Sequence, residues 1–226
     1  MSRTLPPHLA GQDLRETILD EADALLARFG YARFTVDELA RAVGIGKGTV
    51  YLHFRSKEEV TLSVIDRVVL RVEQALSALV AGSADAPDRL REMLVARVLL
   101  RYDSFAHYQG SVQELVGALR QSLHVRRQDF AHREAGILAR VIAEGIQAGD
   151  FARRVPLETA HLLMLATEAL MPSNLSARDI GDRITVQARS KALADVLVEG
   201  LRGAPRGRAS RTRSITARAR VLKKVR

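Results

Sequence analysis

The sequence has 226 residues, 47% of them apolar, so the chain is long enough to bury a substantial core and is not of a disordered type. It contains no cysteine, which excludes disulfide bonds and thiolate metal sites and is compatible with a reducing compartment. The N-terminal stretch MSRTLPPHLAGQD lacks the apolar core of an export signal, and no apolar run approaches the roughly 18 residues that span a bilayer. We expect a globular, cytoplasmic protein.

The positive charge of the chain is concentrated at its C-terminal end. The formal net charge is +9, but the stretch 202–226 holds eight arginines and two lysines and no acidic residue. Without these ten, 25 basic residues stand against 26 acidic ones. The basic composition therefore does not by itself predict that the folded body binds nucleic acid, and local patterns must decide. The segment 203–226 is expected to be a basic, disordered tail.

Apolar residues recur with the 3.6-residue period of a helix along the chain, and no stretch alternates long enough to predict a strand. We therefore expect an all-α fold. The first helix is predicted over 14–29, ended by Gly30, because glycine is the usual residue after a helix C-terminus. Its buried stripe is predicted to be Ile18, Leu19, Ala22, Leu25, Leu26 and Phe29.

A second helix begins with a complete set of start signals. Thr35 and Glu38 have the spacing of a capping box, in which the hydroxyl accepts from the third-residue amide and the carboxylate accepts from the cap amide. Phe34 and Leu39 occupy the two hydrophobic-staple positions around it. The helix is predicted to run to about residue 42.

A third, short helix follows almost at once. Gly44 ends the second helix, because glycine tolerates the left-handed backbone of a tight turn, and Gly46 caps a helix over 47–53. Ser56 and Glu59 form a second capping box, which opens a long fourth helix. Two short helices joined by a glycine-containing turn and braced by a longer one are the architecture of a helix-turn-helix, whose second helix enters the major groove of DNA.

Five further helices are predicted over 88–105, 110–120, 124–148, 156–171 and 176–202. The last two carry more apolar surface than one small domain needs, so we expect them to form a four-helix dimer interface. Their apolar residues are Leu162, Leu163, Leu165, Ala166, Leu170, Ile180, Ile184, Leu193, Val196 and Leu197. The predicted domains are 1–57, an N-terminal arm and three-helix DNA-binding domain; 58–202, a helical domain for ligand binding and dimerisation; and the tail.

The short helix lies in a locally positive stretch. Between Arg41 and Lys57 the sequence holds four basic residues and no acidic one. Phosphate contacts from such residues supply most of the non-specific affinity of DNA-binding proteins. The stretch is therefore the candidate surface for double-stranded DNA.

The sequence FTVDELARAVGIGKGTVYLHFRSKEEV over 34–60 closely resembles the signature of the tetracycline-repressor (TetR) family. A weaker similarity is VIAEGIQAGDF over 141–151, which is like a stretch that commonly ends the seventh helix in that family. The resemblance implies a homodimeric transcriptional regulator that reads a near-palindromic operator and is released from it by a small molecule. Gly46 departs from the family pattern, which usually has a hydroxyl residue there, so a cap hydrogen bond is missing.

The resemblance also implies roles for individual residues. Phosphate contacts are implied for Thr35, Tyr51, His53 and Lys57, approach to backbone and base edges for Gly46, Lys47 and Gly48, and base contacts for Thr49 and Leu52. Val50 and Phe54 are implied to belong to the core.

Candidate ligand contacts lie on two of the later helices. Glu168 stands in the apolar helix sequence LLMLATEALM, where a buried charge needs a partner. It is a candidate to line a ligand pocket, and the alternatives are a contact in the dimer interface or exposure to solvent. Arg97, Arg101 and Tyr102, on the predicted helix 88–105, are likewise candidates to line a pocket. The residues His107, His124, His132 and His161, with Asp129 and Glu134 nearby, show no metal-binding spacing.

We expect a ligand-responsive repressor that is not an enzyme and uses no metal or cofactor other than an unknown small-molecule effector. Two alternatives stay open on the residues alone. One is a weakly specific DNA or RNA binder that depends on the tail at 203–226. The other is an enzyme or ligand carrier that merely keeps the helical scaffold.

Overall fold

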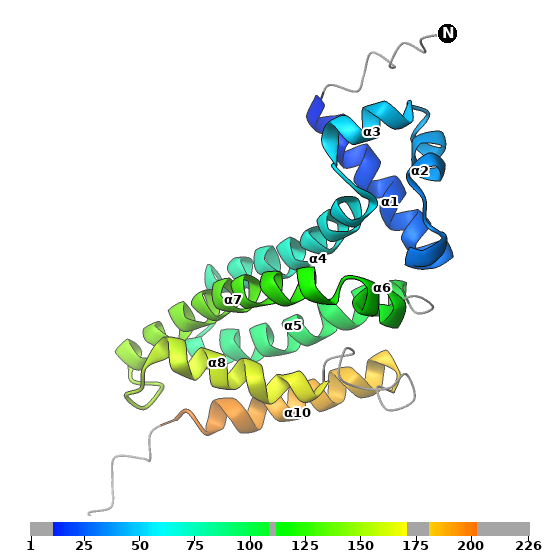
Figure 1. Ribbon diagram of the computed structural model, residues 1–226. Helices are drawn as coiled ribbons and strands as arrows, with labels where there is room; N and C mark the ends of the chain where they lie inside the picture. The colour runs from blue at the N-terminus through cyan, green and yellow to red at the C-terminus, as the bar shows by residue number, and fades with distance from the viewer. Residues whose placement is uncertain (1–10, 109–111, 171–180, 203–226) are drawn as a thin grey trace, which may run out of the picture.

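The computed structural model describes residues 11–108, 112–170 and 181–202 (Figure 1). All regular elements in these ranges are helices, which confirms the all-α prediction. The elements are α1 (Gly11–Arg33), α2 (Val36–Val43), α3 (Lys47–His53), α4 (Lys57–Val80), α5 (Ala86–His107), α6 (Val112–Ala118), α7 (Arg120–Ala148), α8 (Pro156–Thr167), the 3₁₀ helix η1 (Glu168–Leu170) and α10 (Arg183–Glu199). Within the described ranges, no helix has the length and apolar composition needed to cross a membrane.

The helices α1 to α3 form a head at one end of the molecule, and α4 leads from it to the layers formed by α5, α7, α8 and α10 (Figure 1). Gly30 has φ 76° and interrupts the regular helix of α1 at the residue where the helix was predicted to end. One more turn follows it, to Arg33. That turn is closed by a bond from the Phe34 amide to the Gly30 carbonyl at 3.1 Å. Gly44 has φ 79° and ends α2 in the left-handed conformation predicted for it.

Both predicted capping boxes form their first hydrogen bond. The amide of Glu38 donates to Thr35 Oγ1 at 3.2 Å, and the amide of Glu59 donates to Ser56 Oγ at 3.1 Å. The carboxylates of Glu38 and Glu59 accept from donors other than the predicted cap amides. Glu38 accepts from the Thr35 hydroxyl at 2.9 Å, because that hydroxyl still has a proton to donate, and Glu59 accepts from the amide of Arg55 at 2.6 Å. Each helix start is nevertheless fixed by its own sequence.

The later helices lie where they were predicted, with shifted ends. The helix α5 begins earlier than predicted, because Asp85 accepts from the Asp88 amide at 2.8 Å and a proline occupies the first turn. The helices α6 and α7 are separated only at Leu119. The predicted start of the last helix at residue 176, and Ile180 of the predicted dimer face, lie outside the described residues. The helix α10 begins after Asp182, which accepts from the Thr185 amide at 2.7 Å.

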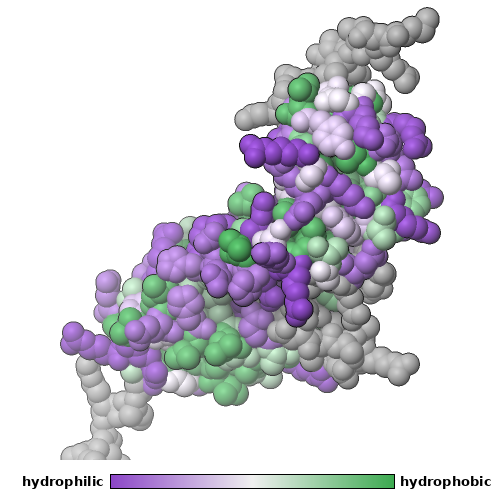
Figure 2. All heavy atoms as spheres, in the orientation of Figure 1, coloured by the Kyte–Doolittle hydropathy of each residue, from purple (hydrophilic) through white to green (hydrophobic). Residues whose placement is uncertain are grey.

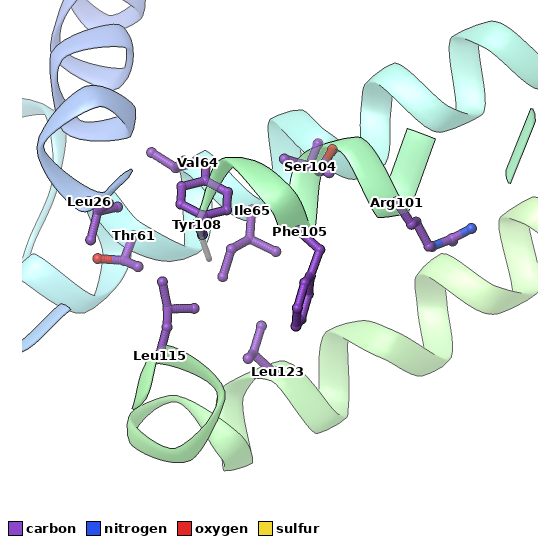
Figure 3. Close-up of a pocket in the computed structure, with 11 residues that line it drawn as sticks. Leu26, Thr61, Val64, Ile65, Arg101, Ser104, Phe105, Tyr108, Leu115 and Leu123 are labelled. Atoms are coloured by element: carbon purple, nitrogen blue, oxygen red, sulfur yellow. The ribbon is translucent and has the colours of Figure 1, made fainter. Parts of the chain in front are cut away.

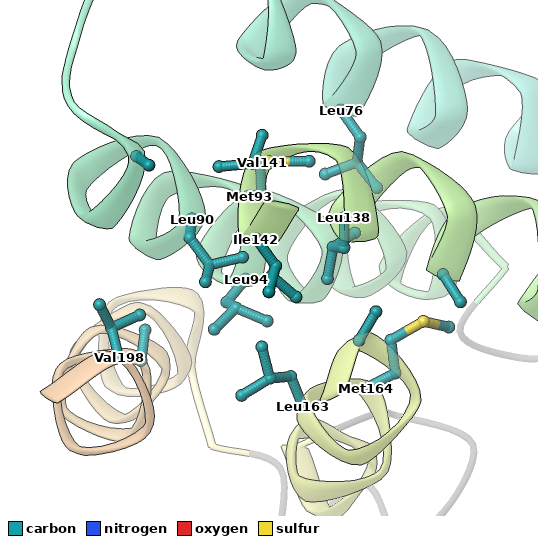
Figure 4. Packing of buried hydrophobic residues seen from close by; sticks show 14 of the residues in the cluster. Leu76, Leu90, Met93, Leu94, Leu138, Val141, Ile142, Leu163, Met164 and Val198 are labelled. Atoms are coloured by element: carbon teal, nitrogen blue, oxygen red, sulfur yellow. The ribbon is translucent and has the colours of Figure 1, made fainter. Parts of the chain in front are cut away.

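The buried apolar residues form two main clusters, and α4 contributes to both. Val60, Leu62 and Val64 of its first turns pack with α1 to α3, so the N-terminal cluster extends past the predicted boundary at 57/58. Val72 and Leu76, further along α4, pack with α5, α7, α8 and α10, where leucine, valine and methionine side chains interdigitate (Figure 4). The head and the larger helical body thus share one continuous helix.

A buried ionic cluster ties α5, α7 and α8 together. The side chain of Arg97 is only 1% exposed, and its Nε donates to Glu134 Oε1 at 2.7 Å. Its Nη1 donates to the hydroxyl of Thr167 and to the carbonyl of Met164. Arg101 Nη2 donates to the second oxygen of Glu134 at 2.5 Å. One carboxylate from α7 is therefore shared by two guanidinium groups from α5.

The charges in this cluster depend on one another. Burial alone would raise the pKa of Glu134, but the hydrogen bonds and charges of Arg101 and Arg97 outweigh it and hold that pKa below its ordinary value. Burial lowers the pKa of Arg97, yet a guanidinium starts from so high a value that it stays protonated. Both partners are therefore ionised in the folded protein.

Replacing Glu134 with glutamine should destabilise the fold, because Arg97 then lies buried without a counter-charge. We expect a loss of about 3–5 kcal/mol in the free energy of unfolding, measured by urea denaturation at neutral pH. Glu144→Gln on the same helix, where the carboxylate is 46% exposed and pairs with Arg89, should cost no more than about 1 kcal/mol.

The same substitution has a pH signature. Because the pKa of Glu134 is depressed by folding, its stabilisation is present above the unfolded carboxyl pKa and is lost as the pH falls through the folded value. The difference in Tm between wild type and Glu134→Gln should therefore shrink on acidification. A difference that is constant with pH would contradict an ionised Glu134.

Two glycines of α7 should respond oppositely to alanine. A Cβ at Gly145 would lie within 2.5 Å of two ring carbons of Phe151 and 3.0 Å from the Cβ of Ala86, whereas a Cβ at Gly136 meets nothing within 4 Å. Gly145→Ala should cost about 1–3 kcal/mol by overpacking, and Gly136→Ala should gain up to about 1 kcal/mol of helix propensity. Thermal unfolding of both variants measures this, and equal effects would show that the ring of Phe151 moves aside freely.

Candidate nucleic-acid interface

The short helix α3 is held by two core residues and turns its other side chains outward. Val50 is fully buried and Phe54, its C-cap, is 1% exposed, as predicted for core residues. On the opposite side Leu52 is 84% exposed and Tyr51 is 46% exposed. Both side chains are therefore accessible to a partner surface. The helix lies on the part of the head away from α5, α7, α8 and α10 (Figure 1).

Most of the predicted DNA-contacting residues lie together on this helix or at its start. Gly46, Lys47 and Gly48 are exposed, and Thr49 and His53 are half-buried. Thr35, at the start of α2, is exposed as well. The contacts of these residues with DNA stay predictions.

Lys47 forms an ion pair with Asp37 across the helix-turn-helix. Its Nζ lies 2.7 Å from Asp37 Oδ2, and this hydrogen bond is the main reason why the pKa of Lys47 is raised. Both side chains are about half exposed, so the pair is weak and salt-sensitive. A DNA phosphate can therefore compete with Asp37 for the lysine.

Lys57 is directed at the junction of α1 and α2. Its Nζ lies 4.3 Å from the ring centre of Tyr31 and 5.9 Å from that of Phe34, and it donates to the carbonyl of Ala32 at 3.4 Å. Burial lowers the pKa of this lysine. In this structure Lys57 therefore contacts the head itself, and the predicted phosphate contact would require it to give up these contacts.

Gly46 lacks a side-chain cap, as the departure from the family pattern implied. Its backbone has φ −76°, and an added Cβ would meet only Thr49 Oγ1, at 3.8 Å. Neither the backbone conformation nor the neighbouring atoms of the protein therefore require glycine here. Arg15 of α1 lies far from the motif in sequence and was not among the predicted residues. It stacks over Phe54 at 4.9 Å and adds a cation beside α3.

The four predicted ligand contacts are not brought into one pocket. A cavity of about 190 Å³ lies among α1, α4, α5, α6 and α7, and of the four only Arg101 lines it. Arg97 is sequestered in the ionic cluster, where the charge of Glu168 also acts on it. Tyr102 donates to the carbonyl of Gly181 at 3.1 Å. A ligand role for any of these residues stays a prediction.

The scattered histidines and acids do not form a metal site in the described part of the chain. Within the described residues, no three His, Asp or Glu side chains lie close enough together to hold a metal ion. Glu134, one of the acidic residues near the scattered histidines in the sequence, is the counter-ion of the buried Arg97 and the half-buried Arg101. A lone glutamate at a helical core position was the signal for that role.

Residues 18–64 match the model of a family described as bacterial regulatory proteins, tetR family. The chain is 30% identical over 186 residues to the HTH-type transcriptional regulator EthR of Mycobacterium tuberculosis, covering 81% of this chain and 83% of that one. It is 25% identical over 190 residues to the fatty acid metabolism regulator protein of Bacillus subtilis, covering 81% and 93%.

Solved structures share the fold. A transcriptional regulator from Cytophaga hutchinsonii superposes with a TM-score of 0.67 at 20% identity, over 83% of this chain and 98% of that one. The fatty acid degradation regulator FadR of Bacillus halodurans gives a TM-score of 0.61 at 20% identity, over 89% and 100%. The helix-turn-helix, the matching family model and the relatives all agree: this chain belongs to the TetR family of DNA-binding transcriptional regulators.

Proposed function

We propose that this regulator is a homodimeric, ligand-responsive repressor that binds a near-palindromic operator. The observation that carries the proposal is α3, held from behind by Val50 and Phe54, with Tyr51 and Leu52 facing outward from the head. Such a helix can approach base edges in the major groove, with cations beside it for phosphates. Because one head reads only a few base pairs, a symmetric dimer would read two half-sites about 34 Å, or a multiple of it, apart.

Exposed apolar residues on α8 and α10 support dimerisation. Leu162 and Leu165 of α8 are 66% and 68% exposed, and Ile184 and Val196 of α10 are 78% and 71% exposed. Figure 2 shows hydrophobic atoms gathered over the part of the surface where Figure 1 places α8. An apolar surface of this kind is typical of a protein interface. Leu163, which was predicted to belong to this face, packs into the protein's own core instead, because it lies on the opposite side of α8.

Release from the operator would follow from thermodynamic linkage between ligand binding and DNA binding. A ligand lowers operator affinity only if it binds the conformation with the wrong head spacing better than the DNA-bound one. The shared helix α4 offers the physical connection, since its two halves belong to the two core clusters.

The double variant Lys47→Ala, Tyr51→Ala should abolish operator binding without unfolding the protein, because both side chains are exposed. The operator is first obtained by selecting bound duplexes from genomic fragments at about 150 mM salt, where non-specific binding is weak. Binding is then measured by fluorescence anisotropy. Arg140→Ala, which removes an exposed cation from α7, outside α3 and the helices of the proposed dimer face, serves as the control and should leave operator affinity within about twofold.

Deletion of 203–226 tests the alternative of a tail-driven binder. We expect the truncated protein to bind more weakly and with a shallower salt dependence while keeping its preference for the same sequence. Loss of all sequence-specific binding on truncation would contradict the operator model. The operator model would also be contradicted if selection with the full-length chain enriched no DNA sequence.

Leu165→Glu should dissociate the dimer, because a carboxylate would be buried against the partner's apolar face. Light scattering after size-exclusion chromatography should show a monomer, and operator affinity should fall at least tenfold as one of two half-sites is lost. Val125→Glu on α7, also at an exposed apolar position (64%), should change neither. A dimeric Leu165→Glu protein would place the interface elsewhere.

A further inference from the structure

The cavity between the head and the helices α4 to α7 is lined by apolar side chains from separate elements. Ile65 of α4, Phe105 of α5, Leu115 of α6 and Leu123 of α7 border a common space, and Leu26 of α1 closes it on the side of the head (Figure 3). The cavity therefore touches the head directly. Its volume of about 190 Å³ is larger than an engineered apolar cavity of about 150 Å³ that stays dry and binds benzene.

The two small hydroxyl groups on the cavity wall are bonded to their own helices. Thr61 Oγ1 donates to the carbonyl of Lys57 at 2.9 Å, and Ser104 Oγ donates to the carbonyl of Leu100 at 2.8 Å. Each hydroxyl proton is thereby used within the protein. The wall offers a ligand the methyl or methylene carbon of these residues.

The two larger polar residues on the wall are also engaged elsewhere. Both terminal nitrogens of Arg101 bond to Glu134, and its guanidinium lies away from the other lining residues (Figure 3). The hydroxyl of Tyr108 donates to Asp23 of α1. Burial, with the hydrogen bond to Asp23, raises the pKa of this tyrosine, so it stays neutral. The surface that remains toward the cavity is carbon.

We propose that this cavity is a binding site for a small, neutral, apolar ligand, such as an aromatic ring or a short hydrocarbon chain. A charged or strongly hydrogen-bonding group would lose its water without finding a partner, which costs several kcal/mol. An apolar group of the right size gains contacts that solvent does not offer, since water is held poorly in a carbon-lined space. The wall thus selects against carboxylates and amines.

The ligand would be sensed through α6, a step that rests on the proposed function. Leu115 borders the cavity, and its neighbour Glu114 accepts a hydrogen bond from the amide of Ala32 at the end of α1. Lys57 holds the carbonyl of the same residue. A ligand that displaces Leu115 therefore also disturbs the contact between α6 and the head.

Binding is tested on the full-length protein without DNA, by calorimetry with toluene and with benzoate as its charged counterpart. Toluene should bind saturably, and benzoate at least tenfold more weakly. Leu123→Phe and Ile65→Phe fill the cavity and should each weaken toluene binding at least tenfold. Leu70→Phe, at a position 48% exposed on α4, is the matched control and should change it less than twofold. Equal binding of benzoate, or unchanged binding by both folded filling variants, would overturn the site.

The coupling is tested by measuring operator affinity with and without saturating toluene. We expect at least a threefold weakening, which Glu114→Gln should reduce without changing toluene binding. An unchanged operator affinity in wild type would overturn the coupling and leave the site standing. If the protein without toluene bound no operator at all, the proposed function would fail and the coupling with it, whereas the calorimetric result would remain valid.

Discussion

The packing of α5 against α7 and α8 depends on keeping one carboxylate ionised inside the core. Glu134 is 2% exposed and accepts from two guanidinium groups, and Arg97 continues the network to α8 through Thr167 and the Met164 carbonyl. A buried charge without a partner is far more costly than an apolar residue of the same size, so the register of α5, α7 and α8 that completes these bonds is favoured over registers that leave a charge unpaired. The cluster therefore contributes more to the uniqueness of the arrangement than to its net stability.

The same cluster decides what the neighbouring cavity can hold. Because Glu134 occupies the guanidinium of Arg101, only the stem of that arginine faces the cavity. An arginine released from this pair would make the wall suitable for an anion. The chemistry of the cavity wall is thus influenced by a carboxylate that does not itself line the cavity.

Local signals allowed much of the head to be predicted. The bounds of α3, the left-handed Gly44 and the caps at Thr35 and Ser56 each depend on residues within four positions of one another, so the sequence contains the whole interaction. The bonding of the acidic residues in the two boxes was predicted less well, because a carboxylate can choose among several nearby donors.

Contacts between distant segments were harder to predict. Arg97 and Glu134 are 37 positions apart, and their pairing depends on how α5 packs against α7, so Arg97 was predicted to line a pocket and no partner was predicted for Glu134. Leu163 and Leu162 are neighbours in an apolar helix, and only the packing of α8 shows that one faces inward and the other outward. Lys57 matched the family motif, but the ring of Tyr31 that it contacts lies outside that motif. In each case the residue type and its helix could be predicted, but the residues that it contacts in the folded chain could not.

The continuity of α4 has a mechanical consequence. A helix of 24 residues is about 36 Å long, and packing at both ends makes it act as a stiff lever rather than a hinge. A rotation of only about 5° at one end moves the other end by about 3 Å, roughly the rise of one base pair. In a symmetric pair the two displacements add. A small rearrangement among α5, α7, α8 and α10 is therefore enough to shift two recognition helices relative to the grooves of the same duplex.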